Sequence, residues 1–383
     1  QVETRGDQSP DELIHRLGKT GAFVRALDEE VLAGDADLAV HSLKDLPTED
    51  MADLVVAGVP ERAPSGDVVV QPDGLGIEEL PAGAVVGTGS LRRGAQIRAT
   101  RPDLTVEPIR GNVDTRLEKL LAPGLQAEHE RRLIASGEDS ALTAEADEDG
   151  DETADDTDDE GTDGDEVDEE FDETADDTDD EGTDGDEVDE EFDETVEEWF
   201  DSLSDLERDA MERRVETEYD AIVLAAAGLE RVGLLDELEV QHLPRNTFVP
   251  APGQGALAIT AAADSDVVDL LRTSLDHRPT RIATTAERIV LAELGGGCVA
   301  PLGIHATLQG RHVRVTVKAY SRDGSESVEM NRDLPVESYA SAARSFAREV
   351  AEAGASELIE AAKRDAGVEA AEDDAASATG EEE

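Results

Sequence analysis

Lysine is scarce in this sequence, although charged residues are abundant. Only five of the 33 basic residues in the 383-residue chain are lysines, whereas 95 residues are acidic and the formal net charge is −62. A chain this acidic is not expected to bind nucleic acid or an anionic membrane through general charge. Excess acid keeps a protein soluble and monomeric where salt screens its self-repulsion, so the composition indicates a monomer adapted to a salt-rich cytoplasm.

Cysteine occurs only once, as Cys298, and long apolar runs are lacking. A single cysteine excludes an intrachain disulfide and fits a reducing cytoplasm. No run approaches the roughly 20 apolar residues of a membrane span, and no signal peptide is visible, so we expect no membrane association. The chain is long enough for two or three domains, each with a core of its own.

The acidic residues are concentrated between positions 138 and 198. Residues 151–171 recur identically as 172–192, and each copy has 13 acidic residues out of 21. Such a segment buries too little apolar surface to offset its ordering entropy, which predicts a disordered, solvated spacer. Short helices are predicted at its edges, at 128–135 and 199–214. An EF-hand-like calcium loop at 159–170 is the alternative, but Gly161 stands where such a loop needs a carboxylate or amide ligand.

Elsewhere, short apolar strands alternate with helices. Strands are predicted at 36–40, 54–59, 84–87, 104–109, 221–226 and 257–262, and helices at 27–32, 91–99 and 115–121. This alternation predicts an α/β fold with largely parallel sheets, in which ligands bind at the carboxyl ends of strands, near helix N-termini.

Residues 282–362 have the pattern of a separate small α+β domain. A helix is predicted at 286–294, a strand at 313–319 and a long helix at 339–363. The strand alternates apolar and polar residues, as half-buried strands do. The acidic tail at 370–383 is predicted to be unstructured.

Polar residues crowd the end of the first predicted strand, in the run HSLKDLP. Ser42, Lys44 and Asp45 lie there, where an α/β protein places its site. A carboxylate beside a lysine suits general acid–base chemistry or stabilisation of a developing cation. A polar turn without a function explains the same residues, so the run by itself leaves both readings open.

Two arginine clusters stand at predicted strand–helix junctions. The run GTGSLRR contains Thr88, Ser90, Arg92 and Arg93, and the run RGNVDTR contains Arg110, Asn112 and Arg116. Helix N-terminal amides and bidentate guanidinium groups both favour anions, so the clusters predict a polycarboxylate or phosphate site. Pairing with surface acids is the alternative, which explains scattered arginines better than two clusters at junctions.

Two glycine-containing loops lie further along the chain. VPAPGQGAL, at 249–257, is punctuated by proline and glycine, and we interpret it as a hinge between domains. The run GGGC presents Cys298 on a flexible backbone. A buried cysteine is usually an inert small apolar residue, whereas one on a glycine loop is suited to covalent chemistry, and the residues alone leave this open.

Six segments, taken in order, resemble the porphobilinogen deaminase (hydroxymethylbilane synthase) family. They are VHSLKDLPT, GTGSLRR, IRGNVDTR, YDAIVLAAAGLERVGL, APGQGALAI and AERIVLAELGGGCVAPLG; with GKTGAFVRALDEEVLAGDADLAVHS they cover most of the chain outside the insert and tail. The resemblance implies a transferase that condenses four porphobilinogen molecules head to tail to hydroxymethylbilane, with release of ammonia. It places the protein in tetrapyrrole (heme or cobalamin) biosynthesis and suggests handover of the product to uroporphyrinogen-III synthase.

The resemblance also implies an architecture: two periplasmic-binding-protein-like doubly wound domains and a small α+β C-terminal domain that carries the cofactor cysteine. The expected domains are domain 1 at 1–62, completed by 242–262; domain 2 at 63–241, interrupted by a disordered insert at 123–216 with its tandem repeat at 151–192; the cofactor-cysteine domain at 263–365; and the acidic tail at 366–383. The opening VETRGDQSPD resembles the segment after the family's first strand and helix. Domain 1 is therefore expected to be N-terminally incomplete, as in a truncated sequence.

Roles for individual residues follow from the same resemblance. A dipyrromethane cofactor, built from substrate, would be joined through a thioether to Cys298, and Asp45 would be the catalytic carboxylate. The expected ligands of the cofactor and of the acetate and propionate arms of the substrate are Ser42, Lys44, Thr88, Ser90, Arg92, Arg93, Arg110, Asn112, Arg116 and Arg231. No metal is called for. A polycarboxylate-binding protein without chemistry, and a degenerate relative acting through its acidic repeat, are the alternatives.

Overall fold

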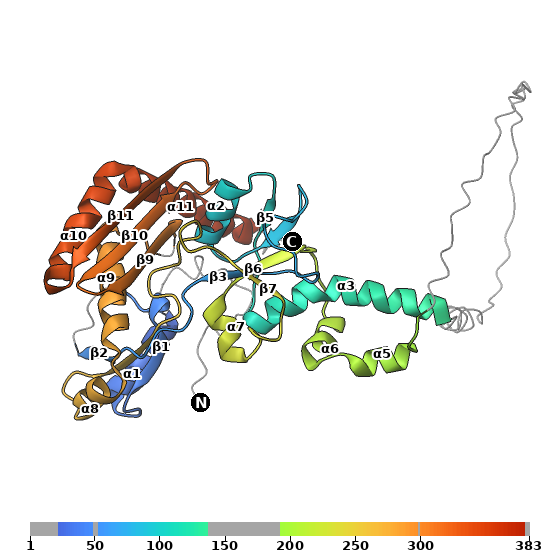
Figure 1. Ribbon diagram of the computed structural model, residues 1–383, viewed down its shortest axis with the longest axis horizontal. Coiled ribbons are helices and arrows are strands. Elements are labelled where there is room, and N and C mark those ends of the chain that lie inside the picture. Colours follow the sequence, from blue (N-terminus) through green and yellow to red (C-terminus); the bar gives the residue numbers. More distant parts are fainter. Residues whose placement is uncertain (1–21, 49–52, 137–191, 298, 380–383) are drawn as a thin grey trace, which may run out of the picture. The chain divides into compact units, whose positions relative to one another are not determined.

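A computed structural model describes residues 22–48, 53–136, 192–297 and 299–379, which form a mixed α/β protein (Figure 1). Two compact units are present, one made of Gln1–Pro123 and Glu212–Glu383 and the other of Gly124–Met211. Cys298, the calcium-loop alternative and all of the tandem repeat except Phe192 lie outside the described residues. No helix in the described ranges is long and apolar enough to span a bilayer.

The first sheet combines strands from both stretches of chain that form the larger unit. Its strands are β1 (Ala39–Ser42), β8 (Leu257–Ala262) and β2 (Leu54–Gly58), in that spatial order, and β8 is antiparallel to both neighbours. Helices α1 (Ala22–Ala33) and α8 (Val267–Leu275) contact this sheet. The strand predicted at 36–40 begins instead at Ala39, because the residues before it form the exposed turn that follows α1.

The prediction of largely parallel sheets is wrong for this sheet. Strands β1 and β2 run in the same direction, as expected of strands joined by a crossover, but β8 lies between them and pairs antiparallel with each. The sequence pattern describes only neighbours along the chain, and β8 comes from about 200 residues further on. Its register, Ser42 opposite Leu257, fixes where the HSLKDLP turn begins.

The second sheet has five strands in the order β5-β4-β6-β3-β7. They are β5 (Thr105–Glu107), β4 (Val85–Gly87), β6 (Ala221–Ala225), β3 (Asp67–Val70) and β7 (Val240–His242). Strand β4 is parallel to β5 and β6, whereas β3 is antiparallel to β6 and β7. The helices α2 (Leu91–Thr100), α3 (Val113–Ser136) and α7 (Ala226–Val232) follow β4, β5 and β6. Three helix N-termini therefore gather at one edge of the sheet.

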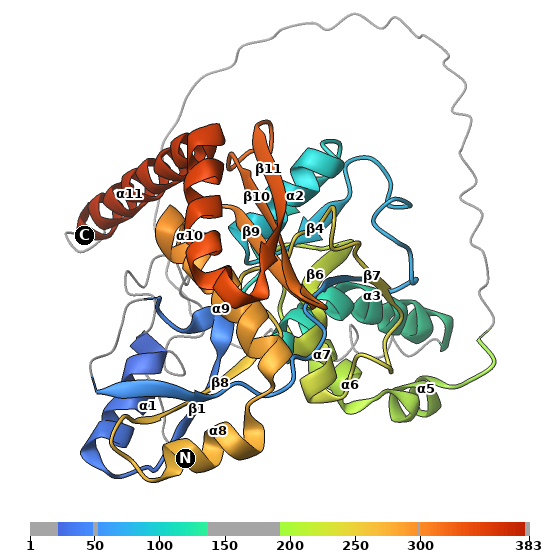
Figure 2. The same cartoon turned by 60° about the vertical axis from the view of Figure 1, so that its left-hand side comes forward.

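The third sheet is an antiparallel meander, β9 (Leu302–Gln309), β10 (His312–Tyr320) and β11 (Ser327–Pro335). Helices α9 (Arg278–Leu294), α10 (Tyr339–Val350) and α11 (Ser356–Thr379) contribute to its core (Figure 2). The helix predicted over 339–363 is interrupted by a π-helical turn, where Gly354 has a φ of 110°. The tail predicted to be unstructured, 370–383, is helical as far as Thr379, so that prediction is wrong over 370–379.

Both ends of 123–216 are helical in the smaller unit, so the disorder predicted for that whole range is wrong there, whereas short helices were expected at 128–135 and 199–214. Helix α3 continues to Ser136, and α5 (Val196–Ser202) and α6 (Asp205–Met211) form a second layer. The Arg132 guanidinium lies over the Trp199 ring at 5.1 Å, and the His129 ring stacks on Trp199 at 5.9 Å. One buried aromatic ring thus supplies the apolar surface that the acidic sequence otherwise lacks.

Candidate active site

Short polar side chains cap the backbone at the edge where α2 and α3 begin. Ser90 is the N-cap of α2, and its hydroxyl accepts a hydrogen bond from the Arg93 amide. Thr88 Oγ1 accepts from the Ser90 amide at 3.3 Å, and Asn112 Oδ1 accepts from the Thr115 amide at 2.8 Å. These residues hold the two loops in place, so that the helix N-termini face the same edge of the sheet.

Three arginines at this edge repel one another. Burial lowers the pKa of the Arg116 guanidinium to about 10, and the positive charges of Arg93 and Arg110 add to that shift. Arg116 Nε donates to the Gly111 carbonyl at 2.9 Å, which fixes the side chain against its own loop. Because positive charge is concentrated beside helix N-termini, an anionic ligand would be stabilised here. The structure thus brings together Arg93, Arg110 and Arg116, as the two motifs predicted.

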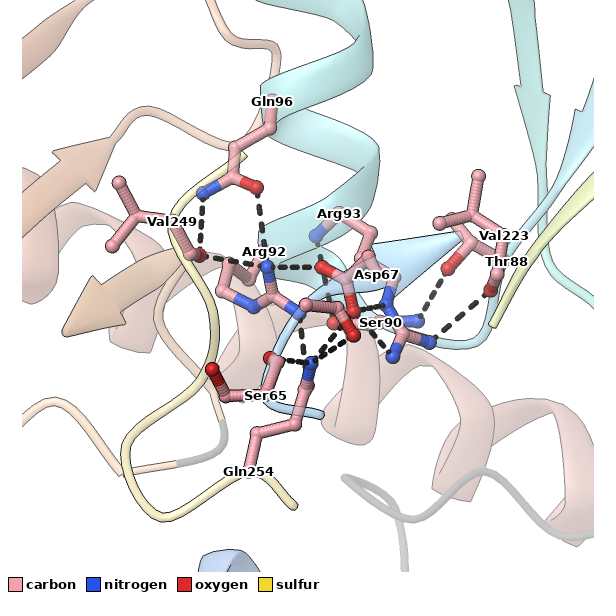
Figure 3. Close-up of polar contacts among 11 residues, drawn as sticks. Ser65, Asp67, Thr88, Ser90, Arg92, Arg93, Gln96, Val223, Val249 and Gln254 are labelled. Carbon is pink, nitrogen blue, oxygen red and sulfur yellow. Dashed lines mark hydrogen bonds and ion pairs between the residues drawn. The ribbon is translucent and has the colours of Figure 1, made fainter. Parts of the chain in front are cut away.

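Arg92 and Arg93 are held inside the protein by Asp67, the first residue of β3. They are only 5% and 6% exposed. Asp67 Oδ2 accepts from Arg92 Nη1 at 2.8 Å, and Asp67 Oδ1 accepts from Arg93 Nε at 3.0 Å (Figure 3). Gln254 Nε2 donates to the same Oδ1 at 2.8 Å. Protein acceptors therefore engage both guanidinium groups, and their role as ligands of a bound carboxylate stays a prediction.

Asp67 is charged although it is fully buried. Burial alone would raise the pKa of its carboxyl, but the positive charges of Arg92 and Arg93 outweigh burial and lower it to about 2. Burial in turn lowers the pKa of Arg93, and Asp67 opposes that shift. The carboxylate and the two guanidinium groups therefore depend on one another for their charge, and they fix the first turn of α2 to β3.

The HSLKDLP turn leaves the edge of the first sheet. Ser42 ends β1, and Leu43–Asp45 form a single 3-10 turn in which Lys44 and Asp45 are exposed to solvent. Gly253 packs against this turn with a φ of 76°, and a Cβ there would lie 3.1 Å from the backbone nitrogen of Lys44. The buried backbone of the turn is thus closely packed, while the side chain of Asp45 is exposed to solvent.

The segment Val249–Ala256 joins the three sheets. Ala256 accepts from the Leu43 amide at 2.9 Å, Pro250 accepts from the Ile304 amide at 2.9 Å, and Gln254 reaches Asp67. Arg231, exposed on α7, donates to the Gly255 carbonyl at 3.2 Å, which brings this predicted ligand close to the same segment. The proposed hinge motion stays a prediction, but the structure shows that the segment is a buried junction.

The base of the Cys298 loop lies at the end of the third sheet that approaches α2. The Pro301 carbonyl accepts from the Tyr320 amide at 3.0 Å, so the loop is beside the turn that connects β10 to β11. That turn packs on α2: a Cβ on Gly324 would lie 2.5 Å from the Ala95 carbonyl oxygen. The described neighbours of Cys298 and the helix that carries Arg92 and Arg93 therefore belong to one region of the larger unit.

Sequence reasoning missed the residues that hold this region together. They are Asp67 and Gln254; Arg62, which pairs with Glu287 and donates to the Gln254 carbonyl; and Arg288, which donates to the backbone after Asp45. The run DVVV at 67–70 has the continuous apolar pattern of a fully buried strand, and its leading aspartate was the available signal. Two adjacent arginines at the start of an otherwise buried helix require a buried acceptor, which is the second signal that the motifs contained.

The fold and the site together define an α/β protein that gathers arginines beside helix N-termini, an arrangement that suits an anionic ligand. A family model described as "Porphobilinogen deaminase, dipyromethane cofactor binding domain" matches residues 1–130 and 207–269, and one described as "Porphobilinogen deaminase, C-terminal domain" matches 282–352. The chain belongs to the porphobilinogen deaminase family. Members of this family are transferases that polymerise porphobilinogen on a dipyrromethane cofactor, as the sequence motifs predicted.

Several named relatives are similar to this chain over almost its whole length. A "Probable porphobilinogen deaminase" of Halobacterium salinarum is 54% identical over 378 residues, which cover 96% of this chain and 91% of that protein. Another, of Methanosarcina acetivorans, is 31% identical over 364 residues, covering 94% and 84%. A "Porphobilinogen deaminase" of Thermobifida fusca is 33% identical over 356 residues, covering 90% and 81%.

Proposed function

We propose that this chain condenses four porphobilinogen molecules head to tail to hydroxymethylbilane and releases ammonia at each addition. The observation that carries the proposal is the concentration of Arg93, Arg110 and Arg116 beside helix N-termini, in a chain of this family. Each pyrrole of the substrate bears two carboxylates. A growing chain of such rings explains why a protein with a net charge of −62 retains so many buried and half-buried arginines at one edge.

The residues present fit a covalent dipyrromethane. Burial and mutual repulsion of the arginines favour a polycarboxylate ligand, and Pro301, which follows the glycine loop, bonds to the end of β10, whose turn to β11 packs on α2. We propose a thioether at Cys298, with carboxylate arms held by Arg92, Arg93, Arg110, Arg116 and Arg231. Lys44, Ser42, Thr88, Ser90 and Asn112 would complete this site. When bound, the cofactor supplies the pyrrole to which the first substrate is joined.

Asp45 is the proposed acid–base group. Its carboxylate lies on an exposed turn whose backbone is held by buried contacts, so it can reach the substrate while its position stays fixed. In this role its carboxylic acid form donates a proton to the departing amine, and the carboxylate that remains stabilises the positive charge that develops on the pyrrole. The same carboxylate then takes up the proton lost from the ring carbon at which the new bond forms. Lys44, next to it, is placed to bind a substrate carboxylate.

The finer architecture belongs to the same proposal. The first two sheets would form two periplasmic-binding-protein-like domains, and the third a small domain that carries the cofactor cysteine. The net charge and the single cysteine support a monomer that works in the cytoplasm. Transfer of its product to uroporphyrinogen-III synthase would follow from the proposed reaction.

Turnover of porphobilinogen in high salt tests the proposed function. We expect consumption of substrate with release of one ammonia per molecule, together with formation of hydroxymethylbilane. Isothermal titration calorimetry in the same buffer separates reaction from binding. Binding of porphobilinogen without ammonia release would show a polycarboxylate-binding protein instead.

A further inference from the structure

Arg288, on α9, donates two hydrogen bonds to the backbone that directly follows Asp45. Its Nη1 donates to the Leu46 carbonyl at 2.8 Å, and its Nη2 donates to the Pro47 carbonyl at 2.5 Å. Burial lowers the pKa of this guanidinium, which nevertheless stays charged at neutral pH. Arg288 is not one of the residues proposed to bind the cofactor or the substrate.

The preceding residue of α9 supports the opposite side of the same turn. Glu287 is fully buried, and its Oε2 accepts from the Gly253 amide at 2.7 Å. Gly253 in turn packs on Leu43 and Lys44. Of these two consecutive residues of α9, Arg288 bonds directly to the backbone after Asp45, whereas Glu287 supports the backbone before it through Gly253.

The same helix leads to the cofactor loop. From Arg288, α9 continues to Leu294, about 9 Å further along its axis at the rise of an α-helix. Gly295 ends the helix in the left-handed conformation, and the loop with Cys298 follows. A rigid helix thus connects the turn that bears Asp45 with the start of the loop that bears the cysteine.

We propose that Arg288 is a positioning residue that holds the Asp45 turn at a fixed place relative to the cofactor loop. The inference rests on the proposed role of Asp45. The fork of a guanidinium matches two successive carbonyls, whereas a lysine ammonium is a single point of attachment. Loss of the Arg288 guanidinium frees the backbone after Asp45, but it removes no group that is proposed to bind the cofactor or the substrate.

The test compares Arg288→Ala with Arg281→Ala, a variant of the same helix about two turns earlier. Arg281 also joins α9 to the first sheet: it donates to Asp276 Oδ1 at 2.6 Å and to the Val56 carbonyl at 3.3 Å, but it does not contact the Asp45 turn. For Arg288→Ala we expect kcat to fall about 10- to 100-fold, because a small displacement of a catalytic group costs that much. KM and the mass of the bound cofactor should stay near those of the parent.

Chemical rescue distinguishes positioning from general stability. Added guanidinium ion, at a concentration too low to unfold the protein, should restore part of kcat in Arg288→Ala and none in Arg281→Ala. Equal losses of kcat in both variants, following equal losses of thermal stability and without rescue, would overturn the proposal. If Arg288→Ala does not fold, Arg288→Lys carries the test, with a smaller loss of kcat expected; a kcat equal to that of the parent would overturn it.

A further variant separates this inference from the function on which it rests. If Asp45→Asn retains full turnover, the catalytic assignment fails and the positioning role fails with it. If Asp45→Asn is inactive while Arg288→Ala has the kcat of the parent enzyme, only the positioning role is wrong.

Discussion

Asp45→Asn is expected to lower kcat by about 10²- to 10⁴-fold, the usual contribution of a general acid–base group. The amide keeps the size of the side chain but cannot transfer the proton. Asp45 is exposed and its backbone is held by neighbouring residues, so folding should not suffer. The rate of ammonia release by the variant, measured beside that of the parent in high salt, gives the ratio of the two kcat values.

Asp37→Asn is the matched control for that experiment. Asp37 is exposed just before β1, and the substitution makes the same change of charge without touching the turn. We expect its kcat to equal that of the parent. An Asp45→Asn enzyme with undiminished kcat would remove Asp45 from the mechanism. Intact mass should show the cofactor on both variants, because neither substitution affects its attachment.

Asp67→Ala is expected to lower the free energy of unfolding by about 3–5 kcal/mol, because it leaves buried guanidinium groups without their counter-charge. Both Arg92 and Arg93 bond to this carboxylate, and Gln254 loses an acceptor as well. Denaturant titration at neutral pH and fixed salt measures the loss. Asp103→Ala, which breaks the ion pair of Asp103 with Arg101 near the surface, should cost much less. Equal losses would contradict the account of Asp67.

The same carboxylate makes a pH-dependent contribution to stability. Its pKa is lowered in the folded state, from 3.8 to about 2, so its stabilisation is complete above the unfolded value and is lost as pH falls from about 4 toward 2. A shift of this size corresponds to about 2 kcal/mol. The variant should therefore lose less stability than the parent over that interval. A parallel decline of both proteins would show that Asp67 does not titrate as the structure indicates.

Local motifs could be predicted from the sequence because each is a strand end and the helix start that follows it. Ser90 and Asn112 cap α2 and α3, and Arg110 and Arg116 follow β5 as the periodicity required. The convergence of these loops also followed from the pattern, since parallel neighbours such as β4 and β5 present their carboxyl ends at one edge.

Contacts between distant segments could not be predicted in this way. Asp67 and Gln254 are 187 positions apart, and β8 inserts between β1 and β2 from a similar distance. The apolar and polar pattern of one segment does not show which distant segment it will contact in the fold. The two arginines of α2 were therefore interpreted as ligands, whereas in the fold both bond to Asp67 of β3, and Arg92 joins that strand to the Val249 carbonyl. Arg288 was overlooked for the same reason.

The intact mass of the protein purified in high salt, beside that of Cys298→Ala, tests the central claim most directly. The account predicts that the parent carries the extra mass of two linked pyrroles and that the variant has the mass of its polypeptide alone. An unmodified parent that nevertheless turns over porphobilinogen, or a variant that still carries the adduct, would contradict the assignment of Cys298 as the point of attachment.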